Sequence, residues 1–147
     1  MSILSNYIRG FNSKRWWKYY KRAQNSSGLV REFYTALYMR LATLSGGYVG
    51  RSTTFLGMPI LPHGFHGIHI SKDAELGVDC IVYQNVTIGN YEGAPCIGNG
   101  VLIGANAVIL GGVTIGDNAK IGAGAIVVEN VPEGATVVGS KARLIIE

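Results

Sequence analysis

The feature that most constrains the fold of this chain is a large apolar residue that returns at every sixth position. The series occupies Val49, Phe55, Leu61, Ile70, Leu76, Val82, Ile88, Ile97, Ile103, Ile109, Ile115, Ile121 and Val127. Glycine often follows the apolar residue directly. A small or β-branched residue stands four positions after the apolar residue. These small residues are Ala74, Cys80, Val86, Val101, Ala107, Val113, Ala119, Ala125 and Val131. A period kept over so many repeats indicates a stack of equivalent structural units.

Neither the 3.6-residue period of a helix nor the plain alternation of a strand explains this pattern. A six-residue unit fits a short flat strand followed by a tight corner, where glycine relieves the backbone. Three units then close one triangular coil, and stacked coils bury a continuous apolar column while their backbones pair. The sequence therefore predicts a mainly β fold, a parallel β-helix built from hexapeptide repeats.

Twice the step between apolar residues is nine instead of six, between Leu61 and Ile70 and between Ile88 and Ile97. These slips of the period correspond to three-residue insertions near 64–66 and within 90–95. A regular solenoid wall offers no place for chemistry, so we expect function where the wall is interrupted. The insertions lie about one and a half coils apart, and the sequence leaves open whether they border one groove within a subunit or across two.

Charge divides the chain into a basic arm and a mildly acidic body. Residues 1–45 hold eight Lys/Arg and one acid, whereas the remainder holds five Lys/Arg and eight acids. We expect an N-terminal arm over 1–47, a β-helix over 48–132 and a C-terminal tail over 133–147, in one domain of 147 residues. No apolar run reaches the roughly 18 residues that a membrane span needs.

The arm is predicted to contain a helix from Leu29 to Leu44. Its apolar stripe would comprise Leu29, Phe33, Leu37, Tyr38, Leu41 and Leu44. The preceding basic and aromatic segment has two interpretations, a contact with an anionic membrane surface or a cap over the open end of the solenoid with subunit contacts. Aromatic residues among lysines also suit nucleic acid, but nothing else in the sequence supports that role. Cys80 and Cys96 both fall in apolar pattern and are expected to be buried thiols of a cytoplasmic protein.

The segment IGNGVLIGANAVILGGVTIGDNAKIGAGAIVVENVP resembles the hexapeptide-repeat acyltransferases. The resemblance covers the chain from about residue 49 and implies a left-handed parallel β-helix. The segments GIHIS and QNVTIG, one coil apart, are similar to those of serine acetyltransferases and of shorter relatives that O-acetylate sugars.

This resemblance implies His63 as the catalytic base. It also implies an acceptor site that includes His66, Gln84 and Asn85. A neutral imidazole suits the role because its pKa lies near working pH. His69 alternates outward on its strand and is expected to be a surface residue. We expect no metal, because histidines at i, i+3 and i+6 do not converge easily on one tetrahedral ion.

The acyl donor implied by the resemblance is acetyl-CoA, held along the seam between the subunits of a homotrimer. The small residues Gly104, Ala105 and Ala123 match the wall on which the pantetheine arm lies. Lys141, which stands where the family usually has proline, and Arg143 are expected to meet the CoA phosphates.

The acceptor is expected to be a sugar hydroxyl in capsule, exopolysaccharide or lipopolysaccharide synthesis. The reaction is expected in the cytoplasm, at the inner face of the membrane if the arm binds that surface. Serine acetyltransferases place an acid immediately before the catalytic histidine, where this chain has Pro62, and carry a longer helical N-terminal domain. Serine O-acetylation remains the alternative. A γ-type carbonic anhydrase and a non-catalytic β-helix module are further alternatives, with less in the sequence to favour them.

Overall fold

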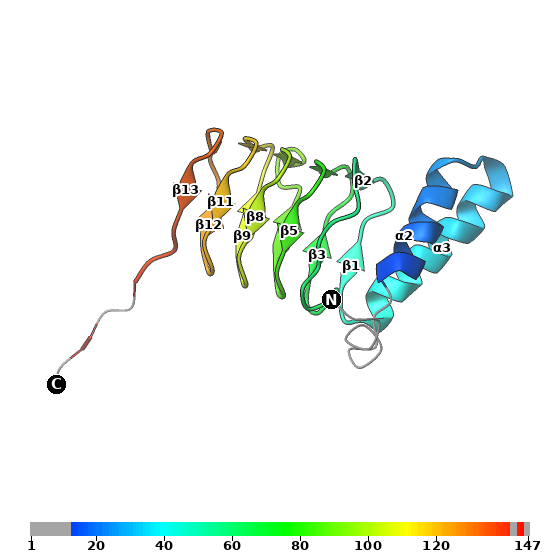
Figure 1. The fold of residues 1–147 in the computed structure, drawn as a ribbon, viewed down its shortest axis with the longest axis horizontal. Helices are drawn as coiled ribbons and strands as arrows, with labels where there is room; N and C mark the ends of the chain where they lie inside the picture. Colours follow the sequence, from blue (N-terminus) through cyan, green and yellow to red (C-terminus); the bar gives the residue numbers. More distant parts are fainter. Residues whose placement is uncertain (1–12, 142–143, 146–147) are drawn as a thin grey trace.

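The computed structural model describes residues 13–141 and 144–145, and from Tyr48 onward its strands form a three-sided parallel solenoid (Figure 1). Sheet A contains β1 (Tyr48–Val49), β3 (His69–Ile70), β6 (Thr87–Gly89), β9 (Val108–Leu110) and β12 (Ile126–Val127). Sheet B contains β2 (Thr54–Phe55), β4 (Glu75–Leu76), β7 (Cys96–Ile97) and β10 (Thr114–Ile115). Sheet C contains β5 (Ile81–Val82), β8 (Leu102–Ile103), β11 (Lys120–Ile121) and β13 (Thr136–Val137).

The strand register stacks the sixth-position residues directly above one another. In sheet A, Ile70 pairs with Ile88, which pairs with Ile109 and then with Val127. Twelve of the thirteen predicted apolar positions are buried, and the exception, Leu61, is half-buried against the same core. All nine small residues predicted at the corners are buried as well. The predicted hexapeptide β-helix with a helical arm is thus confirmed, and β13 extends sheet C beyond the domain boundary expected at residue 132.

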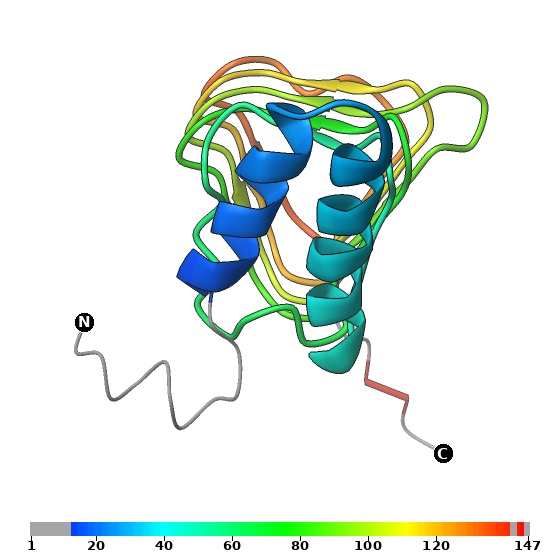
Figure 2. The same cartoon turned by 90° about the vertical axis from the view of Figure 1, so that its right-hand side faces the viewer.

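Two helices cover the first coil of the solenoid (Figure 2). They are α2 (Ser13–Gln24) and α3 (Gly28–Leu44), which pack against each other. Trp16 of α2 is 1% exposed and lies with its ring 5.3 Å from Phe55 and 4.9 Å from Phe65. The Tyr20 hydroxyl accepts a hydrogen bond from the backbone N–H of Phe55 at 2.8 Å. This segment of the arm therefore closes the open end of the apolar column, as the capping interpretation expected.

Helix α3 has the predicted extent but turns a different face to the core. Its buried residues are Thr35, Tyr38 and Ala42, so Tyr38 alone of the predicted stripe is buried. Burial raises the pKa of Tyr38 to about 12, and its hydroxyl donates to the carbonyl of Arg51 at 3.0 Å. The stripe was wrong because Tyr38 packs its ring against those of Trp16 and Tyr20 in α2, which turns the side of α3 that carries Leu29 and Phe33 away from the core.

The other stripe residues are half-buried or exposed, and Leu29, Phe33 and Leu44 are 88%, 61% and 70% exposed. Neither described helix is long and apolar enough to cross a membrane.

The two insertions leave the wall at opposite ends of sheet A. The first forms the turn 62–67, where the chain enters sheet A. It follows Ile60, which forms a parallel bridge with Ile81 of β5, and it precedes β3. The second, residues 90–95, follows β6 where the chain leaves sheet A, and it projects from the prism in Figure 2. A single chain therefore places them on different corners, and a groove shared by both insertions requires two subunits.

The cysteines differ in exposure, which corrects the expectation that both are buried. Cys80 is buried at a corner and lies with its sulfur 3.1 Å from the carbonyl oxygen of Gly98. Cys96 is exposed because it precedes the inward-facing Ile97 in β7, and alternation along the strand turns it outward.

We expect only one thiol of the native protein to react rapidly with a chromogenic disulfide reagent. Cys96 is exposed, whereas burial shields Cys80 and raises the pKa of its thiol, which lowers the thiolate fraction. Denaturant should make both thiols reactive. The variant Cys96→Ser should lose the rapid phase, and two rapid thiols in the native wild type would contradict the placement of Cys80.

Candidate active site

Seven of the predicted site residues lie on one corner of the prism, where the chain passes from sheet C to sheet A: His63, His66, Gln84, Asn85, Gly104, Ala105 and Ala123. Backbone hydrogen bonds stack the successive coils there. Asn85 N–H donates to the carbonyl of His66 at 2.9 Å, and Asn106 N–H donates to that of Gln84 at 3.1 Å. Gly124 N–H donates to the carbonyl of Ala105 at 2.9 Å. The residues predicted for base, acceptor and donor therefore belong to neighbouring coils of the same corner.

His63 lies in the turn 62–67 with its side chain exposed. Its neighbours Gly64 and Phe65 are buried, and Phe65 anchors the turn against Trp16. The imidazole is therefore held by an ordered turn and still reaches solvent, which a general base needs in order to meet an acceptor.

Tyr83 lies beside His63 and was not among the residues predicted for the site. Its ring centroid lies 6.1 Å from that of His63, with the planes tilted by 45°. It is half-buried at the end of β5, one residue before Gln84. Strand alternation gave a signal, since Val82 points inward and Tyr83 must then point outward on the corner that carries His63.

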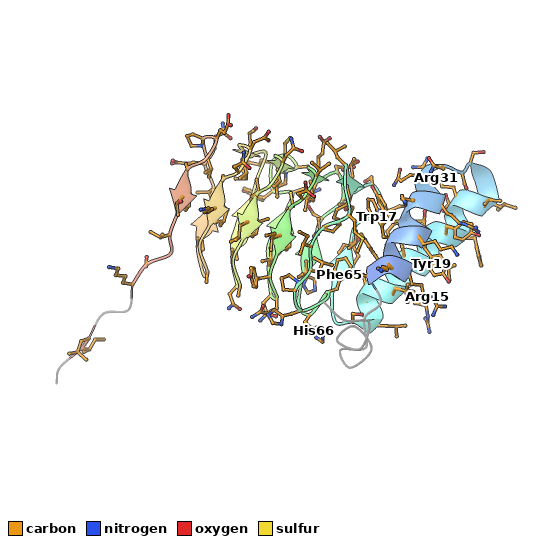
Figure 3. The ribbon with its side chains drawn as sticks, viewed as in Figure 1. Arg15, Trp17, Tyr19, Arg31, Phe65 and His66 are labelled. Atoms are coloured by element: carbon orange, nitrogen blue, oxygen red, sulfur yellow. The ribbon has the colours of Figure 1, made fainter. Side chains whose placement is uncertain are left out.

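The other two histidines have different surroundings. His66 is exposed on the lower edge of the first coils, whereas its neighbour Phe65 faces the helices (Figure 3). His69 is exposed on β3, with Nδ1 3.0 Å from the carbonyl oxygen of Gly67. Among the residues that the structure describes, no three His, Cys, Asp or Glu side chains are grouped so as to hold a metal ion.

Gln84 presents a polar atom that no described residue satisfies. Its Oε1 is shielded from solvent and accepts no hydrogen bond from the protein. Buried polar atoms are normally paired, so this oxygen is left for an ordered water or a ligand. Gln84 is therefore suited to accept a hydrogen bond from a hydroxyl of an acceptor. If its amide flips, the NH2 group can instead donate to a carbonyl oxygen of a ligand.

Asn85 and Asn106 form a short ladder beside Gln84. Both adopt left-handed backbone conformations, with φ of +59° and +60°. Asn85 Nδ2 donates to Asn106 Oδ1 at 3.2 Å. Gly67 stands below Asn85 with φ +65°, where a Cβ would collide with the side-chain oxygen of Asn85. Asn106 was not predicted, and its place in the ladder follows only from the stacking of coils.

The small residues predicted to hold the donor form the upper part of this corner. A Cβ on Gly104 would lie 2.6 Å from the backbone nitrogen of Ala123, so the two coils touch at the backbone. Ala105 is half-buried and Ala123 is exposed, and neither side chain covers the wall. Lys141 is exposed after the last coil, whereas Arg143 lies outside the described residues.

The solenoid matches a known protein family, and most of the chain is similar to a known acetyltransferase. The family described as "Bacterial transferase hexapeptide (six repeats)" matches residues 97–128. A putative colanic acid biosynthesis acetyltransferase of Escherichia coli, WcaB, is 40% identical over 113 residues, covering 74% of this chain and 69% of that protein.

Solved structures extend the likeness to the helices. A serine acetyltransferase of Neisseria gonorrhoeae superimposes with a TM-score of 0.72 at 30% identity, over 94% of this chain and 54% of its own. A serine acetyltransferase solved in complex with CoA gives 0.70 at 28% identity, over 93% and 57%. The chain thus spans little more than half of these serine acetyltransferases.

Together the repeat, the fold and these similarities show that the chain belongs to the hexapeptide-repeat transferase family, among its acetyltransferases. This confirms the family and class predicted from the repeat.

Proposed function

We propose that this protein transfers an acetyl group from acetyl-CoA to a hydroxyl of a sugar or glycan precursor, with His63 as the base. The observation that carries the proposal is the shared corner, where His63, the unpaired Oε1 of Gln84 and the open backbone at Ala105 and Ala123 lie on neighbouring coils. The similarity to WcaB, whose name assigns it to colanic acid biosynthesis, favours an exopolysaccharide acceptor.

The chain's own residues supply proton transfer and positioning. Bound acetyl-CoA would supply the acetyl thioester. A ring nitrogen of neutral His63 accepts the proton of the acceptor hydroxyl as that oxygen bonds to the acetyl carbonyl carbon. The C–S bond of the thioester then breaks, and the imidazolium returns the proton to the departing thiolate sulfur. Gln84 orients the acceptor through its free amide oxygen, which would otherwise remain buried without a partner. No covalent acyl-enzyme is required.

The wall fits coenzyme A at Gly104, Ala105 and Ala123. Their small side chains leave backbone N–H and C=O groups within reach of an extended pantetheine arm. Lys141 and Arg143, in the C-terminal tail, would add charge for the phosphates. We further propose a homotrimer, because one chain leaves the His63 corner uncovered and puts the projecting loop 90–95 on another corner. The acetyl donor places the reaction in the cytoplasm.

Serine is the second candidate acceptor, since the structural similarity to serine acetyltransferases extends over both helices. Against it stands Pro62, which precedes His63 and offers no carboxylate to hold the amino group of serine. A thiol-release assay with acetyl-CoA distinguishes the two acceptors when run against serine, galactosides, glucosides and nucleotide sugars. We expect CoA release with a sugar; release with serine alone would replace the proposal by the serine alternative.

Enlarging Ala123 should block the donor without unfolding the protein. Ala123 is exposed, so Ala123→Trp costs little packing but covers the wall that the pantetheine arm needs. We expect the Kd for CoA to rise about tenfold or more, the loss of roughly 1.4 kcal/mol of binding. The matched control is Glu133→Trp, since Glu133 is exposed at the equivalent step of another corner. Equal affinities in calorimetric titration of both variants would place CoA elsewhere.

A further inference from the structure

The side of the helix pair that faces away from the solenoid is turned toward the viewer in Figure 2. Its side chains form a basic half and an apolar half. The basic half belongs to α2, and the apolar half belongs to α3. Capping of the solenoid accounts for the inner faces of these helices but leaves their outer faces unexplained. We call this outer side the end face.

The basic half is a groove between the helices whose lining holds cations and no acid. It is lined by Lys14, Trp17, Lys18, Lys21, Arg22, Asn25, Ser26, Val30 and Tyr34. Lys21 lies with its Nζ 5.9 Å from the centre of the Trp17 ring. Arg22 donates to the Tyr34 hydroxyl at 2.6 Å and lies 5.4 Å from its ring. The aromatic rings thus hold two of the four cations in place at the groove.

Charge on the helix pair is almost entirely positive. Residues 13–45 contain seven Lys/Arg and one acid, Glu32, which is paired with Arg51 of the first coil. Arg15 and Arg31 lie toward opposite ends of the pair in Figure 3, so positive charge extends beyond the groove. Such a surface fits a partner that is extensively negative.

The apolar half consists of the stripe that the sequence had predicted to be buried. Leu29, Val30, Phe33 and Leu44 are 88%, 54%, 61% and 70% exposed. On the helical wheel they lie opposite the buried face of α3, and no described residue covers them. Val30 also lines the basic groove, so the apolar and basic halves are continuous. Leu29, Val30 and Phe33 lie together in the first two turns of α3, and exposed apolar side chains grouped beside cations mark an interaction surface.

We propose that the end face docks on an anionic lipid bilayer. Amphipathic helices that lie in a membrane interface combine Lys/Arg with Leu, Phe and Trp in this way, the apolar side chains entering the acyl boundary while cations meet lipid phosphates. A second copy of this chain is a poorer occupant. Two copies paired through their apolar halves would leave the cations of the basic groove without an opposite charge, whereas an anionic bilayer engages both halves of the end face. The proposal does not depend on the reaction at His63.

Docking of this kind would bring the site close to the membrane surface. The turn 62–67 belongs to the first part of the solenoid, and its Phe65 touches Trp16 of the docking helix. If the proposed function holds, an acceptor carried on a lipid would then lie beside the His63 corner without leaving the bilayer.

Vesicle co-sedimentation of the full chain tests the proposal. Vesicles of phosphatidylcholine alone are compared with vesicles that contain phosphatidylglycerol. The wild type should bind only the anionic vesicles, with affinity that falls as salt rises. Lys14→Gln, Lys18→Gln and Lys21→Gln combined should weaken binding about a hundredfold. Leu29→Ser with Phe33→Ser should weaken binding at least tenfold, and this loss should depend less on the salt concentration than the loss in the lysine variant.

The matched control is Lys72→Gln with Lys120→Gln, two exposed lysines of the solenoid wall, which should bind as the wild type does. All variants replace exposed residues, and circular dichroism checks that they fold. Equal loss in the control would overturn the proposal, as would retained binding in both end-face variants. Concentration-dependent self-association that Leu29→Ser with Phe33→Ser abolishes, without vesicle binding by the wild type, would assign the surface to a second copy instead.

Discussion

Replacing His63 by alanine should lower acetyl transfer by about 10²- to 10⁴-fold, the usual contribution of a positioned general base. His66 is the other titratable side chain of the turn 62–67, and it lies at the lower edge of the coil (Figure 3). His63 is exposed and its ring neighbour Tyr83 is itself only half-buried, so the variant should unfold close to the wild-type temperature. CoA affinity should be unchanged, because the proposed donor wall begins at Gly104.

The controls for this variant are His66→Ala and His69→Ala. Both side chains are exposed, and we expect His69→Ala to retain full turnover and His66→Ala to change the KM for the acceptor more than kcat. A His63→Ala enzyme with near-wild-type kcat would remove His63 from the mechanism. A loss shared equally by all three variants would indicate a general disturbance of the turn.

Replacing Trp16 by alanine should lower the free energy of unfolding by about 3–5 kcal/mol. Trp16 is 1% exposed and lies within 6.3 Å, centroid to centroid, of the rings of Tyr20, Tyr38, Phe55 and Phe65. Its removal leaves a cavity over the end of the apolar column and takes away the contacts of α2 with Phe55 and Phe65 that Trp16 makes. Urea denaturation followed by circular dichroism measures the change.

Trp17→Ala is the matched control for Trp16→Ala. It removes the same side chain one position along α2, but Trp17 is only half-buried and faces the groove beside Lys21. We expect a clearly smaller loss of stability. Similar losses in the two variants would mean that the helices do not cap the solenoid through Trp16.

The solenoid could be predicted from the sequence because each hexapeptide sets its own inward residue. Ile97, Ile103 and Ile109 follow one another at six-residue intervals, and closing the chain every three units puts each above its counterpart in the next coil. The shared corner of His63, Gln84 and Ala105 follows from the same arithmetic once the first slip is known. Local spacing thus determined both the core and the alignment of the site.

Features that depend on contacts between distant segments could not be predicted in this way. The buried face of α3 depends on contact with the rings of α2, since Tyr38 lies with its ring 5.5 Å from that of Tyr20. The pairing of Tyr83 with His63 depends on how the turn 62–67 folds back toward the next coil. Cys96 was misjudged although alternation within β7 would have placed it outside.

The most direct test of the central claim is identification of the acetylated product by nuclear magnetic resonance after incubation with acetyl-CoA and the sugar acceptors. We predict one new O-acetyl ester on a sugar hydroxyl, formed in equal amount with free CoA and absent with the His63→Ala enzyme. An acetyl ester found only on serine, or acetyl-CoA left intact with every acceptor, would contradict the claim.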